Sequence, residues 1–123
     1  MGWRVWMATM ALASISSGPA LVAEDRIAIR VDPRFAFAPA NLLVRTTVSR
    51  RDEHRWLEVV AESANFFRSS EVPLEGASAP RVSYFQFRGI PPGEYFVIAI
   101  VRGVNGDELA RSQVKADIVD SEF

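Results

Sequence analysis

Residues 85–101 read FQFRGIPPGEYFVIAIV, and this stretch predicts two strands joined by a rigid corner. Polar and aromatic residues alternate before the corner, and an almost continuous apolar run follows it. Within the corner, Pro91 and Pro92 hold the backbone φ angle near about −65°, while Gly93 permits a positive φ. Tyr95 opens the outgoing strand, and a tyrosine in this place can hydrogen-bond back across such a corner. We therefore predict that Tyr95 anchors the corner.

Short segments with alternating side chains occur along most of the remaining chain. We predict seven strands, at residues 26–32, 41–49, 55–63, 65–75, 81–88, 94–102 and 108–119. Alternation with a period of two indicates strands that are buried on one face. The strand at 94–102 is apolar on both faces, which indicates a central strand covered on both sides. Seven short strands and no amphipathic helix predict an all-β, immunoglobulin-like antiparallel sandwich over residues 24–120, with a frayed tail at 121–123.

The corner also resembles a known family. Residues 87–97, FRGIPPGEYFV, are similar to the corner of prealbumin-like and carboxypeptidase-regulatory-like modules, in which two strands frame a Leu/Ile-Pro-Pro-Gly-x-Tyr-x-Val run. The likeness covers these eleven residues and concerns folding. It implies an immunoglobulin-like sandwich with Pro91, Pro92, Gly93 and Tyr95 as its structural corner. Such modules are typically non-catalytic attachments to other domains, so the resemblance implies an accessory role.

Residues 1–23 have the pattern of a secretory signal peptide. Arg4 supplies a positive charge, residues 5–15 form an apolar core, and a Ser-Ser-Gly-Pro run precedes a zone of small residues. A helix over this apolar core would rise only about 16 Å, which is too short for a hydrocarbon layer of roughly 30 Å. We expect cleavage after Ala23, or alternatively after Ala20, and no stable membrane span afterwards. The expected location is periplasmic or secreted.

The composition argues against several classes of function. The chain of 123 residues has 14 Lys and Arg residues, 15 Asp and Glu residues, and no cysteine. Without an excess of positive charge, we do not expect the protein to bind nucleic acid. Without cysteine, the chain cannot form disulfides, a thiolate nucleophile or a Cys-bound zinc site. We predict no cofactor.

The candidate catalytic groups lack partners in the sequence. His54 is the single histidine, and it lies in the charged run 50–55, which we interpret as a solvated turn. Glu58 and Glu62 would lie about 13 Å apart along one strand, too far for the carboxylate pair of a glycosidase. A short sandwich also offers little material for a cleft. We therefore expect neither an enzyme nor a metal site.

Residues 35–39, FAFAP, are predicted to connect the first two strands. We expect Phe35 and Phe37 to plug the end of the core. The alternative is that these two side chains form an exposed hydrophobic patch.

A patch of aromatic and basic side chains is the best candidate for an interaction surface. Trp56 shares a strand face with two glutamates, so we expect its side chain to be partly exposed. Arg55 precedes it, and Arg45 would lie nearby across a hairpin of the second and third predicted strands. Tryptophan and arginine are frequent in the energetic centres of interfaces. The alternative is a tryptophan on the rim that partly covers the end of the sandwich.

These observations predict a small exported, non-catalytic protein. We expect it to act by contact with a protein partner in the cell envelope, or as a structural accessory there. The alternative is a module that binds a carbohydrate or an envelope polymer through exposed aromatic side chains.

Overall fold

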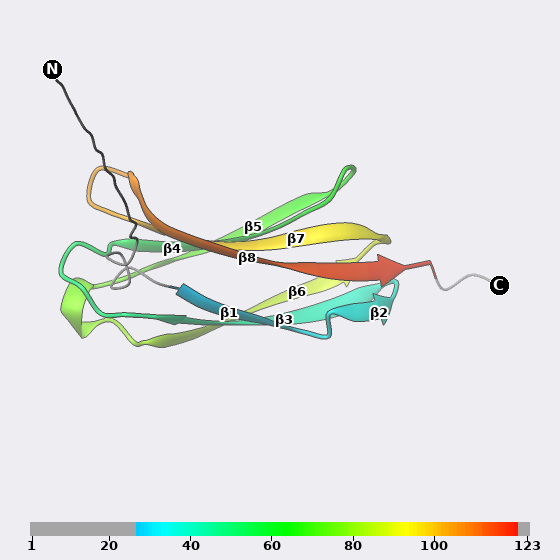
Figure 1. Ribbon diagram of the computed structural model, residues 1–123, viewed down its shortest axis with the longest axis horizontal. Helices are drawn as coiled ribbons and strands as arrows, with labels where there is room; N and C mark the ends of the chain where they lie inside the picture. Colours follow the sequence, from blue (N-terminus) through cyan, green and yellow to red (C-terminus); the bar gives the residue numbers. More distant parts are fainter. Residues whose placement is uncertain (1–26, 121–123) are drawn as a thin grey trace, which may run out of the picture.

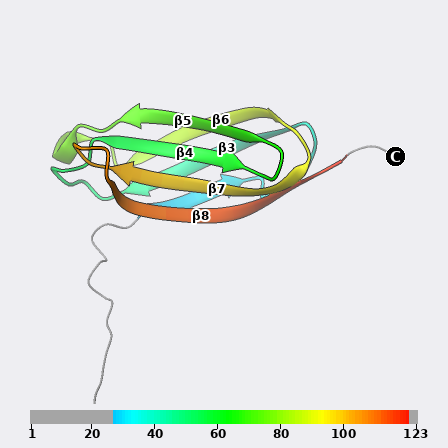
Figure 2. The same ribbon diagram turned by 90° about the horizontal axis from the view of Figure 1, so that it is seen from above.

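The computed structural model describes residues 27–120, and eight strands form two sheets that lie face to face (Figure 1). The three-stranded sheet contains, in order, β1 (Ile27–Asp32), β3 (Ala40–Val48) and β6 (Val82–Ile90). The five-stranded sheet contains, in order, β2 (Phe35–Phe37), β8 (Glu108–Val119), β7 (Gly93–Arg102), β4 (Trp56–Glu62) and β5 (Phe67–Pro73). Figure 2 shows β8, β7, β4 and β5 side by side from above. The predicted signal peptide, 1–23, and the predicted tail, 121–123, lie outside the described residues.

Each of the seven predicted strand segments contains a strand, but the number of strands and their pairing differ from the prediction. Residues 35–37, predicted as a connection, form the short strand β2, which pairs in parallel with the end of β8. The sandwich is therefore not entirely antiparallel. The predicted hairpin of β3 and β4 is also wrong, because these strands lie in different sheets. Alternation along each strand is local, and it does not specify which partner the strand takes.

The two phenylalanines of β2 do not plug the core. Phe35 and Phe37 are 62% and 59% exposed, and their rings meet edge to face with centroids 6.4 Å apart. Ala36, between them, packs against the core instead. Successive side chains of a strand point to opposite faces, so burying the small alanine turns both aromatic rings outward. The structure therefore agrees with the alternative prediction, in which these two side chains form an exposed hydrophobic patch.

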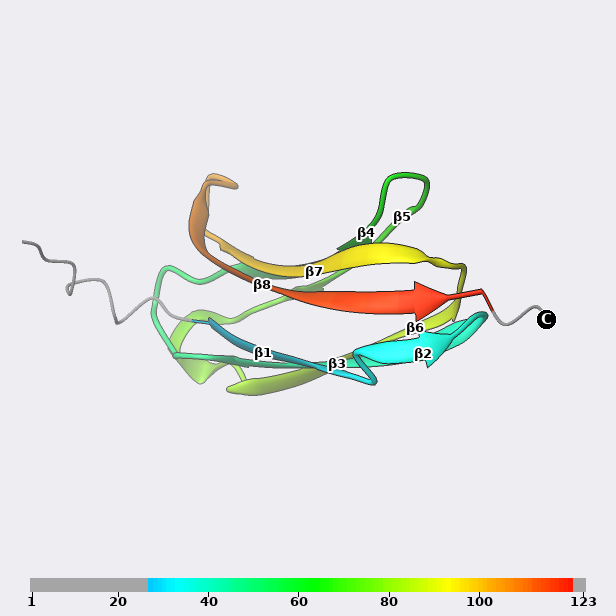
Figure 3. The same cartoon turned by 45° about the vertical axis from the view of Figure 1, so that its right-hand side comes forward.

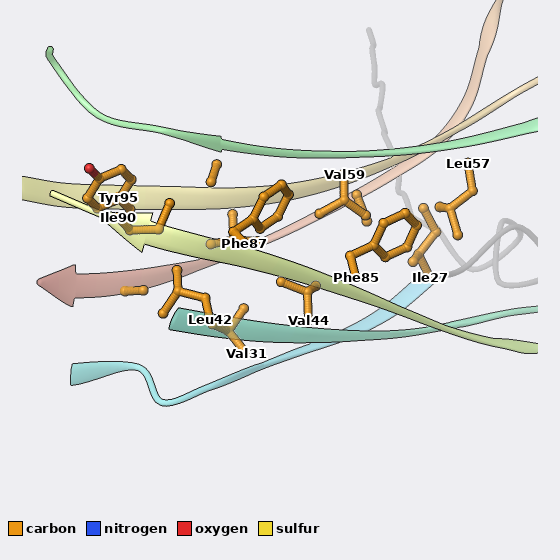
Figure 4. Packing of buried hydrophobic residues seen from close by; sticks show 14 of the residues in the cluster. Ile27, Val31, Leu42, Val44, Leu57, Val59, Phe85, Phe87, Ile90 and Tyr95 are labelled. Atoms are coloured by element: carbon orange, nitrogen blue, oxygen red, sulfur yellow. The ribbon is translucent and has the colours of Figure 1, made fainter. Parts of the chain in front are cut away.

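The hydrophobic core lies between the two sheets (Figure 4). Inward-facing side chains of both sheets are fully buried, among them Leu42, Val44, Leu57, Val59 and Val97. Within residues 27–120, the single helical element is the one-turn 3-10 helix Gly76–Ser78, and no helix could cross a membrane.

The corner passes from β6 in one sheet to β7 in the other. The Tyr95 side chain is 1% exposed, and its hydroxyl donates a hydrogen bond to the carbonyl oxygen of Pro91 at 2.8 Å. Its ring lies edge-on to that of Phe66, with centroids 6.1 Å apart. Before the corner, Gly89 has a left-handed φ of 65° at an irregularity of the β3–β6 pairing, and its N–H donates to the side chain of Asn41.

His54 is buried, which corrects the prediction of a solvated turn. Its side chain is 2% exposed. The His54 carbonyl oxygen accepts hydrogen bonds from the N–H of Gly76 at 3.1 Å and from the Arg55 guanidinium at 3.0 Å. These bonds fasten the loop to the one-turn helix, which carries the imidazole inside although its sequence neighbours are charged.

Candidate functional site

Exposed aromatic side chains gather on the outer side of the five-stranded sheet. The described residues expose eight large hydrophobic side chains, and five of them lie on this one side. These five are Phe35 and Phe37 on β2, Trp56 on β4, Phe67 on β5 and Phe96 on β7. We call this surface the aromatic face. Monomeric proteins rarely expose a large apolar patch without using it for binding, so the concentration on one side marks a candidate site.

Strand register sets the spacing of the aromatic side chains. Phe67 and Phe96 flank Glu62 in one row across three neighbouring strands, so they lie about 10 Å apart. Trp56 stands at the other end of β4, six positions from Glu62, which places it roughly 20 Å along the strand. The aromatic face therefore has exposed aromatic side chains at both ends of the sheet.

An aliphatic cluster occupies the middle of the aromatic face. Val60 of β4 and Ile98 of β7 are opposite each other, and Ile100 follows on the same side. These three side chains are 5–7% exposed although they lie on the outer side of the sheet. The predicted covering of both faces therefore holds for the second half of β7, whereas Phe96, nearer its start, is 41% exposed. The cluster carries no group that can form a hydrogen bond.

Acidic groups outnumber basic groups on this side of the sheet. The outward positions carry six carboxylates, at Glu58, Glu62, Glu71, Glu94, Glu108 and Asp117, and three basic groups, at Arg102, Arg111 and Lys115. Two carboxylate pairs lie directly opposite each other on neighbouring strands: Glu58 faces Glu71, and Glu94 faces Asp117. Like charges in such positions are destabilising. The aromatic face therefore has an excess of three negative charges.

Two ion pairs neutralise part of this charge. The Arg102 guanidinium lies 3.2 Å from a carboxylate oxygen of Glu58. Arg111 donates hydrogen bonds to both carboxylate oxygens of Glu108, at 2.9 and 3.0 Å. These bonds hold the pKa of the Glu108 carboxyl below its ordinary value. The third basic group, the Lys115 ammonium, lies 6.0 Å from the centroid of the Phe96 ring, so all three are already engaged within the chain.

The sheet is curved toward the outside. In Figures 1 and 3, the β4–β5 hairpin and the β7–β8 hairpin both rise away from the three-stranded sheet, at opposite ends of the molecule. The strands of the five-stranded sheet therefore bend away from the core at these two hairpins.

The structure does not bring together the three side chains predicted to form an interaction surface. Trp56 lies on the aromatic face and is 41% exposed. Arg45 lies on the outer side of the three-stranded sheet, across the molecule. Arg55 donates to the carbonyl oxygens of Asp52 and His54 and so serves its own loop. Their separation follows from the placement of β3 and β4 in different sheets.

The sequence prediction missed Phe67 and Phe96, and it gave the exposure of Phe35 and Phe37 only as the alternative. Phe96 shares a strand face with Glu94, and Phe67 shares one with Glu71, which was the available signal for an outward orientation. Phe35 and Phe37 flank a small alanine that could face inward. Their gathering with Trp56 depended on strand order, which local alternation does not encode. Among residues 27–120, no group of three or more His, Cys, Asp or Glu side chains is placed to hold a metal ion.

Comparison with known proteins relates the chain to others through its fold. No protein-family model and no curated protein matches it. A superoxide reductase (neelaredoxin) from Ignicoccus hospitalis matches with a TM-score of 0.58 and 16% identity over 76% of this chain and 80% of the reductase chain. A variant of that reductase gives a TM-score of 0.61 at 17% identity, covering 78% of this chain and 82% of its own. These likenesses concern the fold.

A much larger enzyme contains a similar unit. A family 76 glycoside hydrolase from a bovine Bacteroides thetaiotaomicron strain matches with a TM-score of 0.54 and 12% identity. The match covers 75% of this chain but 20% of the hydrolase chain. The fold thus occurs both nearly by itself and as a small part of a long chain.

The superoxide reductase corrects the prediction that this protein is not an enzyme. That prediction rests in part on the small size of the sandwich, which offers little material for a substrate cleft. The reductase is an enzyme, and four-fifths of its chain is covered by this fold. A sandwich of this size is therefore compatible with an enzyme, and its small dimensions do not exclude enzymatic activity.

Proposed function

We propose that this protein is exported and binds a partner protein through the aromatic face. The partner presents an apolar segment flanked by Lys or Arg residues. The observation that carries the proposal is the gathering of five of the eight exposed large hydrophobic side chains on one side of one sheet. Aromatic residues around an apolar centre with a polar rim are the usual anatomy of a protein interface.

The spacing of the exposed aromatic side chains favours a protein over a carbohydrate. Val60, Ile98 and Ile100 are almost fully buried, so a ligand would meet the flanking side chains, among them Glu58 and Gln113, which can bond sugar hydroxyls. The polarity of the surface therefore does not separate the two ligands. Trp56 lies roughly 20 Å from the row of Phe67 and Phe96, a span that a protein interface covers and a single sugar ring does not. The carbohydrate-binding hypothesis is the second candidate.

The charge of the aromatic face favours a basic partner. Glu94 and Asp117 oppose each other near Phe96, and Glu58 opposes Glu71 near Trp56. Positive side chains from a partner would relieve the repulsion between Glu94 and Asp117 and would speed association. At the other pair, Arg102 already neutralises part of the charge of Glu58. A partner with an acidic rim would be repelled by the same carboxylates, which would weaken binding.

We further propose that the sandwich is immunoglobulin-like. The order β1-β3-β6 in one sheet and β4-β7-β8 in the other matches strands A, B and E and strands C, F and G of immunoglobulin domains. Tyr95, near the start of β7, donates its hydroxyl hydrogen bond to Pro91, four residues upstream. A tyrosine at the start of strand F makes this kind of bond in such domains.

The proposed export rests on the signal-peptide pattern of residues 1–23. It places the partner in the periplasm or outside the cell. Mass spectrometry of the protein from an envelope or extracellular fraction should give an N-terminus at Glu24, or at Leu21 for the alternative cleavage. Recovery of a chain with Met1 intact from the cytosol would rule export out.

Site-specific photo-cross-linking tests the aromatic face. A benzophenone amino acid replaces Phe96 in one variant and Tyr84 in a matched control, which is 63% exposed on the other sheet. Cross-linking in intact cells should give one discrete product from position 96 and none from position 84. Equal products from both positions would contradict the proposal.

Binding to the purified cross-linked partner then measures the contribution of the anchors. We expect Trp56→Ala and Phe96→Ala each to weaken affinity about tenfold or more, with Tyr84→Ala unchanged. A double change of Glu94→Gln and Asp117→Asn should slow association and reduce its dependence on salt. Retention of a polysaccharide on a glycan array, lost in Trp56→Ala, would replace the proposal with the carbohydrate alternative.

A further inference from the structure

A second candidate site lies on the opposite sheet, away from the aromatic face. A hollow of about 570 Å³ opens where the edge strand β1 passes β8. Its lining includes Arg30, Asp32, Arg34, Leu43, Arg45 and Tyr84. Three of these side chains are guanidinium groups and one is a carboxylate, so the lining has two excess positive charges, whereas the whole chain has a net charge of −1.

Two of the arginines are placed directly against each other. Arg30 of β1 and Arg45 of β3 are partners in the antiparallel register, and both point to the exposed outer side. Within residues 27–120, neither side chain forms an ion pair or a hydrogen bond. Like charges at opposed positions of a sheet destabilise it. An anion between the two guanidinium groups would remove this repulsion.

The two arginines also separate two hollows. Besides the larger one, a hollow of about 170 Å³ is lined by Arg30 and Arg45 together with Ala28 and Thr47, the next register pair on the same side of the sheet. An anionic group over the arginine pair can therefore be approached from both directions along the sheet. Arg34 adds a third cation, and its Nε donates to the carbonyl oxygen of Lys115 at 3.3 Å, which fastens it beside β8.

Apolar surface continues from the arginine pair. Tyr84 of β6 is the register partner of Arg45 and is 63% exposed. Leu43, two residues before Arg45 on the same side of β3, is 43% exposed. A ligand with its anionic group on the arginines could therefore place a ring or chain against these two side chains. Guanidinium groups bind phosphate and carboxylate through two parallel hydrogen bonds, which suits both groups as the anionic part.

We propose that this hollow binds an organic anion that carries a phosphate or carboxylate group and an apolar body. The anionic group lies between Arg30 and Arg45, and the apolar body lies along Tyr84 and Leu43. Asp32 at the same lining disfavours an extended polyanion, because a second anionic group would meet its carboxylate. This site is independent of the aromatic face, so either can fail without the other.

Calorimetric titration with phenyl phosphate tests the site directly. We expect saturable binding in the millimolar range or tighter, and weaker binding of inorganic phosphate, which lacks the apolar body. Arg30→Gln and Arg45→Gln should each weaken phenyl phosphate binding about tenfold. Arg88→Gln is the matched control, since Arg88 is an exposed arginine of the same sheet outside the hollow, and it should leave affinity unchanged.

Two results would overturn the proposal. The first is the absence of saturable binding of phenyl phosphate to a wild-type protein that is folded by circular dichroism. The second is equal binding to wild type and to the Arg30→Gln, Arg45→Gln double variant, with both proteins folded. Loss of binding that follows the two arginines, and not Arg88, supports the site.

Vesicles distinguish the source of the anion. Co-sedimentation with phosphatidylglycerol vesicles, absent with phosphatidylcholine and competed by phenyl phosphate, would identify the ligand as a lipid headgroup. Binding of phenyl phosphate without co-sedimentation would identify a soluble anion. Co-sedimentation that Arg30→Gln and Arg45→Gln leave unchanged would show a different surface at work and would count against the hollow.

Discussion

The Tyr95 hydroxyl donates a hydrogen bond to the carbonyl oxygen of Pro91 at 2.8 Å, and this bond spans the corner where the chain leaves one sheet for the other. The ring is 1% exposed and packs edge-on against Phe66 from the β4–β5 hairpin. One side chain therefore connects the corner, the core and a hairpin of the five-stranded sheet.

Removing the Tyr95 hydroxyl and removing its ring should have different costs. Tyr95→Phe loses one hydrogen bond and leaves the partly buried carbonyl of Pro91 without that donor, so we expect a loss of about 1 kcal/mol in the free energy of unfolding. Tyr95→Ala also opens a cavity, and the loss should reach about 3–5 kcal/mol. Urea denaturation measures both, with Tyr84→Phe as an exposed control near zero. Neutral results for both Tyr95 variants would mean that the corner has been assigned the wrong anchor.

There is room for a side chain at Gly89, but the backbone conformation there disfavours any residue other than glycine. A Cβ atom added there would meet nothing within 4 Å, but φ is 65°. An L-residue in this left-handed conformation costs roughly 1–2 kcal/mol. Gly89→Ala should therefore lower the free energy of unfolding by about 1 kcal/mol, measured by urea denaturation. Arg88→Ala, at the exposed neighbouring position, is the control. An equal loss of stability in both variants would mean that the left-handed φ of Gly89 is not the cause.

The opposed pair Arg30 and Arg45 should make stability depend on salt. Screening weakens the repulsion between two exposed charges, so added NaCl should stabilise the wild type. Arg45→Gln removes the repulsion, and it should raise the free energy of unfolding by about 0.5 kcal/mol at low salt. The salt dependence should shrink in Arg45→Gln and persist in Arg88→Gln. Identical thermal melts of Arg45→Gln and wild type at low salt would show that the two charges do not interact.

Glu108 should titrate below an ordinary glutamate. Hydrogen bonds from Arg111 lower its pKa in the folded state, so the pair stabilises the fold above the unfolded pKa of about 4.3. This contribution is lost as the pH falls through the folded pKa. Because both side chains are exposed, it amounts to a few tenths of a kcal/mol. Carboxyl NMR titration should give a higher Glu108 pKa in Arg111→Gln than in wild type, and an unchanged value in Lys115→Gln.

Much of the strand pattern could be predicted because the information is local. A period of two follows from the geometry of an extended chain, so the sequence placed a strand within each of seven segments. Proline and glycine restrict or widen the range of their own backbone angles, so the corner could be located from the sequence. Tyr95 then follows directly after it. The partial exposure of Trp56 followed from its glutamate neighbours on the same strand face.

The candidate sites depended on contacts between distant segments. The sequence placed Arg45 beside Trp56 and left His54 in solvent, whereas strand order separates the first two and backbone bonds to Gly76 bury the third. Alternation determines which side chains share a face of one strand, because that depends on neighbouring residues. Which strands become neighbours depends on burying a common core, and that choice assembled the aromatic face and set Arg30 against Arg45.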